Sequence, residues 1–455
     1  MLKKLANLPA ILCALALALV FALGSAHAGR AQTAPEPERE TLLNGLKILY
    51  WPQPGNSNVL LRLRIHSGAA FDLADKGGMM ALLGDALFPD AATREYVTDE
   101  LGGRLEVTTS HDAIDVTISG KASELERMID LLRGAVLTTQ LGAENVATLR
   151  NARIKLLSDK PATSAEMADA AIAARLFGTF PYGHLAGGTP ASVAKLERAD
   201  LMLGRERFLN ADNATLAVAG GVEKPRVMRA LRQLLGPWAK SERSIPATFR
   251  QPAAPDARVL VLNNPTDSDA EVRLAVRGLT RADNDTVAAT LLARIVRDRW
   301  LKALPQLSSV NIRHETHVLP GMFVLSASTP TELASKAVSI AQEIVRSIAL
   351  TGPSATELES ARYWTQSTIT DPIEAWLDVD TFKSPRPDTI PTLSRSVTPG
   401  DIQRVAARLF KDAPVATVVV GNYDQLKAAF AGKMESGTIA PGSKVSDPAM
   451  PTKKP

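Results

Sequence analysis

The same order of expected strands and helices occurs twice along this chain, and this repeat constrains its fold more than any other feature. In the first half, periodicities of two and of 3.6 residues predict elements at 45–50, 59–66, 76–88, 104–110, 113–120, 123–137, 143–157, 214–219 and 225–235. In the second half, the matching elements are expected at 259–263, 271–277, 283–303, 309–316, 321–328, 332–349, 354–370, 415–420 and 423–430. The strands come in groups separated by helices. This favours an α+β fold, with an antiparallel-rich sheet packed by helices in each half, over a doubly wound parallel sheet.

A segment rich in proline, alanine and serine, 241–256, separates the two halves. The chain has 455 residues, of which 45% are hydrophobic, and this is enough for at least two globular domains. The expected organisation is a first domain at 41–240, this linker, a second domain at 257–432 and a disordered tail at 433–455.

The first residues have the pattern of a secretory signal peptide. Lys3 and Lys4 precede an apolar run at 8–23, and Ala26-His27-Ala28 forms a small-residue cleavage site. The apolar run is short for a membrane span and is followed by polar, proline-containing sequence. We therefore expect a signal peptide at 1–28, a flexible N-terminus at 29–40, a periplasmic location and no membrane anchor after cleavage.

Charge and local motifs argue against several classes of function. The formal net charge is +4, and the basic residues are interspersed with acids, so neither nucleic acid nor a membrane surface is an expected partner. The only cysteine, Cys13, lies inside the expected signal peptide, so the mature chain has no disulfide. No phosphate-binding glycine loop or convincing Gly-x-Ser-x-Gly elbow supports nucleotide binding or serine hydrolysis.

Several short motifs have a distinctive order and spacing. They are Leu43-Asn44-Gly45-Leu46-Lys47, His66-Ser67-Gly68-Ala69, the helical stretch at 77–88, Leu101-Gly102-Gly103, and Phe180-Pro181-Tyr182-Gly183-His184 with Gly188-Thr189. Together with the repeat, they resemble the insulinase or pitrilysin family of zinc metallopeptidases, the inverzincins, over nearly the whole mature chain. The resemblance implies two homologous domains of the mitochondrial-processing-peptidase type.

The zinc-binding motif of that family is missing. Active members carry His-x-x-Glu-His on the helix that corresponds to 76–88, because residues four apart share a helix face and both imidazoles can reach one ion. Aligning this chain on Leu87-Phe88 places Ala81, Gly84 and Asp85 at the His, Glu and His positions. No His-x-x-Glu-His or His-x-x-x-His occurs anywhere in the sequence. We therefore expect no catalytic residue here, no bound metal and no other cofactor.

The other conserved roles of the family are also incomplete. The third zinc ligand, a Glu, should lie about eight residues before Asp159-Lys160-Pro161, and this register selects Arg153, a cation that would repel zinc. The family also holds substrate with an Arg and a Tyr in the second domain. Arg297 or Arg299 could supply the Arg, but no tyrosine occurs between Tyr182 and Tyr363.

Four polar residues have competing interpretations. His314 and His317 are three apart on an expected strand, so they should point to opposite faces and not share a metal. His111 lies where a strand enters a turn, which favours a surface or chamber-wall position over catalysis. Asp85 alone cannot hold zinc, and solvation or helix capping is the expected role.

Three functions remain open. The resemblance implies a non-catalytic subunit that pairs with a zinc-bearing relative to form a peptide-processing chamber, with peptides or unfolded polypeptides as the bound species. The alternative is a stand-alone periplasmic peptide-binding or scaffolding protein without a peptidase partner. The third is a peptidase that acts by another route.

Overall fold

The computed structural model describes residues 35–139, 141–159, 162–241, 249–265, 268–365, 371–431 and 434–437. The expected signal peptide, part of the linker and most of the expected tail lie outside these residues. Within the described part, no helix has both the length and the apolar character that crossing a membrane requires.

Two six-stranded sheets form the frame of the molecule. The strands of the first are β1 (Glu38–Thr41), β2 (Lys47–Pro52), β3 (Asn58–Ile65), β4 (Arg104–Thr109), β5 (Ile114–Lys121) and β6 (Ala214–Gly220). Those of the second are β7 (Val259–Asn263), β8 (Asp269–Arg277), β9 (Ser308–Glu315), β10 (Met322–Pro330), β11 (Ala416–Gly421) and β12 (Met434–Gly437). The spatial orders are β1-β2-β6-β3-β5-β4 and β12-β7-β11-β8-β10-β9. The repeat predicted from sequence is therefore confirmed for five strands of each sheet, whereas the edge strands β1 and β12 come from opposite ends of the described chain and pair in opposite senses.

Both sheets are mostly antiparallel. In the first, only the β2–β6 pairing is parallel, and in the second the β7–β11 and β7–β12 pairings are parallel. This confirms the expected α+β class. Strands β1 and β12 correct two expectations, because they lie in segments predicted to be a flexible N-terminus and a disordered tail. Each strand is four residues long and pairs with a sheet edge, and side chains add to this pairing, because Lys224 forms ion pairs with β1 and Met434 of β12 packs against the core.

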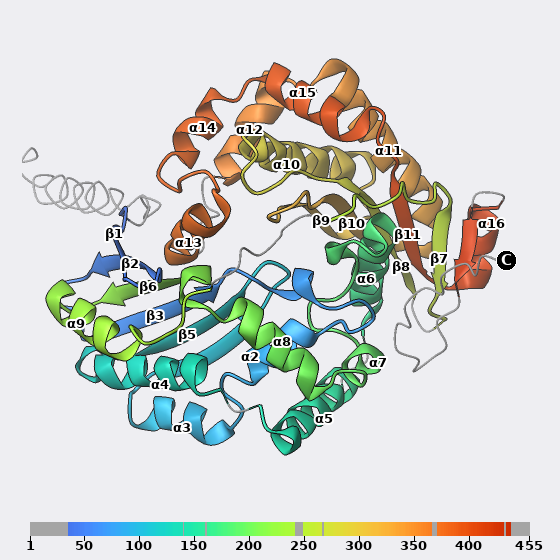
Figure 1. The fold of residues 1–455 in the computed structure, drawn as a ribbon. Coiled ribbons are helices and arrows are strands. Elements are labelled where there is room, and N and C mark those ends of the chain that lie inside the picture. Colours follow the sequence, from blue (N-terminus) through green and yellow to red (C-terminus); the bar gives the residue numbers. More distant parts are fainter. Residues whose placement is uncertain are drawn as a thin grey trace, which may run out of the picture.

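Helices cover the outer side of each sheet and enclose one large hydrophobic core per half (Figure 1). The first sheet carries α2 (Met79–Asp85), α3 (Ala91–Asp99), α4 (Leu125–Leu137), α5 (Ala143–Asp159), α7 (Pro190–Val193), α8 (Arg198–Phe208) and α9 (Lys224–Leu234). The second carries α10 (Thr286–Ala303), α11 (Ala334–Thr351), α12 (Ala355–Thr365), α14 (Ile390–Ser396), α15 (Pro399–Phe410) and α16 (Tyr423–Ala429). Short 3-10 turns join several of them.

Two further helices are exchanged between the halves and lie between the sheets in Figure 1. Helix α6 (Ser164–Phe177) belongs to the first half but packs on β8 and β11 of the second sheet. Helix α13 (Pro372–Phe382) belongs to the second half but packs on the first sheet, where Trp376 and Leu377 join a buried cluster with Leu49 and Trp51. Each expected domain therefore completes its inner face with a helix from the other.

A buried arginine on each sheet pairs with an aspartate of the incoming helix. Arg64 on β3 donates to Asp115 at 2.8 Å and to Asp378 of α13 at 2.5 Å. Arg273 on β8 donates to Asp169 of α6 at 2.6 Å. Because a buried charge is costly without a partner, these pairs specify where each exchanged helix docks.

Candidate functional site

Helix α2, which the family resemblance aligns with the zinc-binding helix, is shorter than its sequence suggests. It was expected at 76–88 but covers Met79–Asp85. It begins after Gly78, whose φ of 92° is accessible to glycine at little cost. The carboxylate of Asp72 accepts hydrogen bonds from the amides of Gly78 (2.7 Å) and Met80 (2.8 Å), which caps the N-terminal end of the helix.

Two of the three motif positions on α2 face the core. Ala81 is buried, and a Cβ atom at Gly84 would lie 2.8 Å from Oγ1 of Thr109 on β4. A side chain at position 84 would therefore require Thr109 to move. Only Asp85 presents a polar side chain, so α2 has no pair of donors that could share a metal ion.

Arg153 of α5 reaches across to Asp85. Its Nη1 lies 2.6 Å from Oδ2 of Asp85, and its Nε donates to the carbonyl oxygen of Gly187 at 3.1 Å. The Arg153 side chain is 14% exposed and that of Asp85 is 39% exposed. Asp85 is therefore partly solvated, as expected, and it also forms one half of an ion pair between α2 and α5, a contact that the sequence did not predict.

These residues do not fit a zinc ion. Ala81 and Gly84 have no donor atoms, and the guanidinium of Arg153 already uses the one carboxylate. Across the described part of the chain, no group of three or more His, Cys, Asp or Glu side chains is arranged to hold a metal. The α2–α5 contact is thus an electrostatic brace between two helices.

Replacing Arg153 with alanine is expected to lower the unfolding free energy by about 1 to 2 kcal/mol, because it removes both the ion pair and the hydrogen bond to Gly187. Urea denaturation followed by tryptophan fluorescence measures the change. Lys155→Ala on the same helix is the control, because Lys155 and its partner Asp159 are both exposed and the pair should contribute less than about 0.5 kcal/mol. Equal losses in the two variants would contradict the bracing role.

The two arginines considered for substrate contact have different surroundings. Arg299 binds both carboxylate oxygens of Glu357 on α12, at 2.7 and 2.9 Å, and with Ser354 it holds the pKa of Glu357 at about 2. Arg297 donates to the carbonyl oxygen of Val310 at 3.3 Å and lies 3.3 Å from Asp298, with 36% of its side chain exposed. Arg297 is therefore more available to a ligand than Arg299.

The three histidines singled out by sequence do not form one site. His314 accepts a hydrogen bond from the amide of Leu279 at 3.2 Å, whereas His317 contacts Asp112 at 3.0 Å. His111 was expected at the surface or on a chamber wall, but it is packed beside His317, with ring centroids 5.6 Å apart, and burial lowers its pKa to about 4. It lies in the contact between the halves. Sequence reasoning did not single out Asp112, which is central to that contact.

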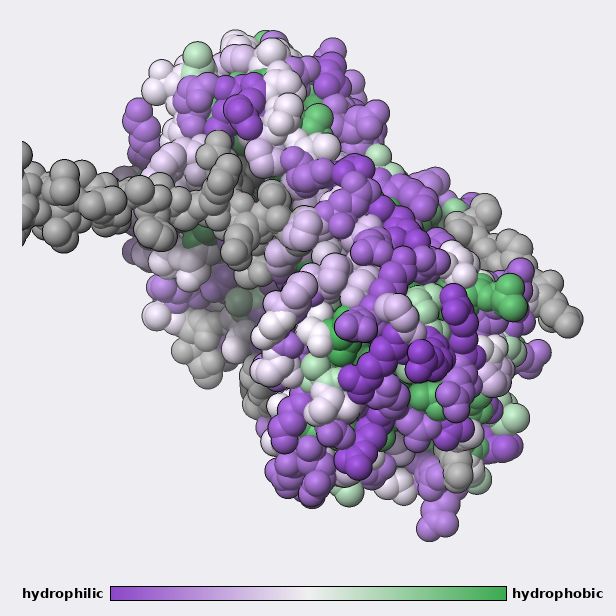
Figure 2. Space-filling model, turned by 90° about the vertical axis from the view of Figure 1, so that its left-hand side faces the viewer, coloured by the Kyte–Doolittle hydropathy of each residue, from purple (hydrophilic) through white to green (hydrophobic). Residues whose placement is uncertain are grey.

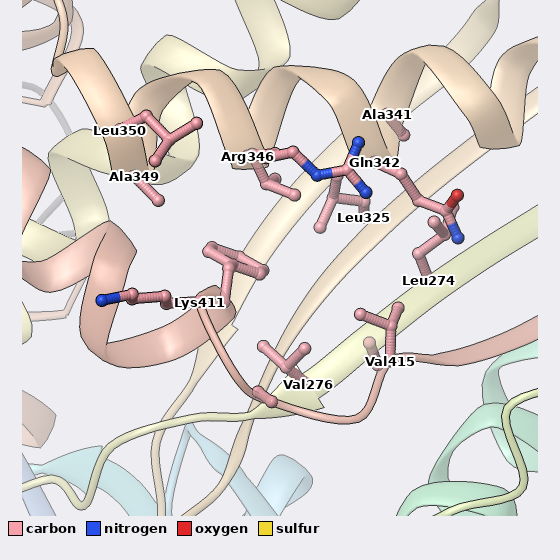
Figure 3. Close-up of a pocket in the computed structure, with 14 residues that line it drawn as sticks. Leu274, Val276, Leu325, Ala341, Gln342, Arg346, Ala349, Leu350, Lys411 and Val415 are labelled. Carbon is pink, nitrogen blue, oxygen red and sulfur yellow. The ribbon is translucent and has the colours of Figure 1, made fainter.

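A separate cavity of about 450 Å³ lies in the second half, between α11 and the turn after α15 (Figure 3). Its floor is apolar and includes Leu274, Val276 and Leu325. The cavity is also lined by three polar or charged residues, Gln342, Arg346 and Lys411. None of the site residues predicted from sequence lines this cavity, so it is not part of the α2–α5 site.

Comparison with known proteins supports the family resemblance. Residues 195–363 match the family model described as the peptidase M16 inactive domain. Over this segment, which is less than half of its length, the chain is similar to the M16, or insulinase, family. It is also 26% identical over 206 residues to an uncharacterised zinc protease of Mycobacterium leprae. That match covers 44% of this chain and 46% of the relative, so the chain spans about half the length of this curated protein.

Solved structures share the fold over most of the chain. The peptidase M16 inactive domain from Pseudomonas fluorescens has a TM-score of 0.76 at 18% identity, covering 85% of this chain and 98% of that one. A protease from Helicobacter pylori has a TM-score of 0.75 at 16% identity, covering 85% and 100%. The periplasmic protease PqqL from Escherichia coli has a TM-score of 0.71 at 15% identity, covering 91% of this chain and 52% of PqqL. The two-domain M16 fold expected from the sequence is confirmed.

Proposed function

We propose that this chain is a non-catalytic subunit that pairs with a zinc-bearing relative to form a peptide-processing chamber in the periplasm. The observation that carries the proposal is the ion pair between Asp85 and Arg153, which stands where the family resemblance places two zinc ligands. The scaffold around it is complete, with both sheets and both exchanged helices present. A scaffold retained without the metal site favours a role in binding and assembly.

Two further observations support the proposed periplasmic location. The first residues have the pattern of a signal peptide, and one structural neighbour is a periplasmic protease. Within the chamber, this subunit would contribute one wall and contacts to peptides or unfolded polypeptides. Arg297 is the candidate for such a contact, because its guanidinium is less engaged than that of Arg299.

The surface supports a partner that binds through polar as well as apolar contacts. The face shown in Figure 2 is mostly hydrophilic, and its hydrophobic residues form small separate patches. Interfaces of non-obligate complexes have about the same apolar fraction as the rest of a protein surface. We therefore expect a heterodimer whose subunits are each stable when separated.

The test compares the purified chain alone with the chain co-expressed with a zinc-bearing M16 protein from the same genome. We expect no zinc and no chelator-sensitive cleavage of an unfolded polypeptide by the chain alone, and a one-to-one complex with such cleavage when the relative is present. Zinc analysis, light scattering after gel filtration and a cleavage assay give the three readouts.

Two results would overturn the proposal, and they lead to different conclusions. Chelator-sensitive cleavage by the chain alone would show that it is a peptidase by another route. A monomer at micromolar concentration that binds unfolded polypeptide but neither binds nor stimulates the zinc-bearing relative would establish the scaffolding alternative. In the matched control, the Arg153→Ala variant should still form the complex, because α2 and α5 are proposed to have lost their catalytic role.

A further inference from the structure

A buried polar cluster joins the halves at the turn between β9 and β10. From the second half, the ring of His317 contacts the carboxylate of Asp112 at 3.0 Å, and the amide of Val318 donates to the same oxygen at 3.3 Å. From the first half, the hydroxyl of Tyr182 donates to the other oxygen of Asp112 at 2.9 Å and accepts a hydrogen bond from the amide of Leu319 at 3.0 Å. Asp112 and Tyr182 together form a receptor for this turn.

The burial of Asp112 makes the contact between the halves sensitive to the loss of any group that hydrogen-bonds to its carboxylate. The residue is only 5% exposed, and burial acts to raise its pKa. Hydrogen bonds from His317 and Tyr182, together with the positive charge of Arg281, outweigh burial and hold the pKa of Asp112 below its usual value. The carboxylate is therefore charged in the folded chain, and removing the turn would leave that charge buried without its main donors.

The cluster continues from this contact to helix α2. The ring of His111 lies edge-on to that of His317, at 5.6 Å between centroids, and its Nε2 lies 2.8 Å from the carbonyl oxygen of His184. The ring of His184 lies 3.3 Å from Oδ2 of Asp72, which caps α2 through two backbone amides. A continuous series of contacts thus runs from the second half to the N-terminal end of the helix that carries Asp85.

We propose that these residues form an inter-half lock, in which the seating of the β9–β10 turn on Asp112 and Tyr182 holds the N-terminal end of α2 in its capped position. The lock is the set Asp72, His111, Asp112, Tyr182, His184 and His317. The lock couples the β9–β10 turn to the N-terminal end of α2, although no single helix or strand connects them. This inference concerns the chain by itself and does not depend on the proposed partner.

The physical reason for the coupling is that Asp72 and Asp112 are both buried carboxylates with their donors fixed by neighbouring elements. If the turn leaves, His317 no longer packs on His111, and the ring of His111 gains room to rotate away from the carbonyl of His184. His184 then loses the packing that keeps its ring against Asp72. The cap of α2 weakens, and the first amides of the helix open more often to solvent.

Hydrogen exchange of the purified chain tests the lock. His317→Gln is expected to raise the exchange rates of amides at 78–85 by about tenfold, an opening that is local compared with global unfolding. His314→Gln is the matched control, because His314 bonds only to the amide of Leu279 within the second half. In that variant, exchange at 78–85 should stay within about twofold of the parent chain.

Tyr182→Phe provides a second route in case His317→Gln does not fold. It removes only the hydroxyl that joins Asp112 to the amide of Leu319 and should raise exchange both at 316–321 and at 78–85. Faster exchange at 316–321 with no change at 78–85 would show that the inter-half contact is not coupled to α2 and would overturn the proposal. An equal rise at 78–85 in His314→Gln would overturn it as well, because the effect would then be general destabilisation.

Discussion

Replacing Arg64 with alanine is expected to lower the unfolding free energy of the chain by about 3 to 5 kcal/mol. The Arg64 side chain is 4% exposed and lies between Asp115 of its own sheet and Asp378 of the exchanged helix α13. Alanine would leave Asp115 without this donor and Asp378 with only the longer 3.2 Å contact to Arg281. Guanidinium denaturation followed by tryptophan fluorescence measures the loss, with Trp51 and Trp376 in the affected cluster.

A surface arginine on the same sheet gives the control. Arg104 is 74% exposed and is 4.0 Å from its nearest acidic partner, Glu106, so Arg104→Ala should change stability by less than about 0.5 kcal/mol. A loss below about 1 kcal/mol in Arg64→Ala would contradict the view that this ion pair network fixes α13 on the first sheet. A loss of the expected size, with early exposure of α13 to protease, would support it.

Acidification from neutral pH to pH 4 is expected to destabilise the fold strongly. Burial lowers the pKa of His66, His111 and His314 to about 4 in each case, with a smaller contribution from Lys47 at His66. These histidines stay neutral in the folded chain down to about pH 4, whereas in the unfolded chain they take up a proton below about pH 6.5. The unfolded state then binds more protons, so stability falls as the pH drops through this window, by up to about 3 kcal/mol per histidine at pH 4.

The carboxylates affect the stability of the fold at lower pH than the histidines do. The pKa values of Asp112 and Glu357 are held below their usual values, so the stability that they contribute is present above about pH 4 and is lost only as the pH falls further. Denaturation midpoints measured at intervals between pH 7.5 and 4 should therefore decline from about pH 6.5. His314→Gln should reduce that slope by about one third. Constant stability between pH 6.5 and 4.5 would show that the three histidines are not buried as described.

The repeat allowed most of the fold to be predicted from sequence. Strands with clear alternation, such as β4, were located within a residue or two, because one face of each is more buried than the other and the period of two is unambiguous. The exchanged helix α6 was missed, because it is rich in alanine and lacks the single apolar stripe on which periodicity depends. Helix α2 was overestimated in length, since the capping carboxylate of Asp72 and the conformation of Gly78 depend on tertiary structure.

The two charged residues of the candidate site were predictable from the sequence, but their contact with each other was not. Aligning the family motif on Leu87-Phe88 and on Asp159-Lys160-Pro161 brought Asp85 and Arg153 into consideration separately, and the structure shows that they bind each other. The lock was not predictable. Asp112 and His317 are 205 residues apart, and His111 and His184 are 73 apart, so only the fold brings these side chains together.

The exchanged helices have a consequence for how the chain is made. Leu49 and Trp51 are synthesised early, but the helix that covers them, α13, begins at Pro372, so more than 300 residues must follow before that face of the first sheet can be completed. A nascent first half would expose this apolar face to other chains, since contacts between distant segments form late in folding. Export before folding would avoid the difficulty, because the entire chain would then be available when its two halves first meet.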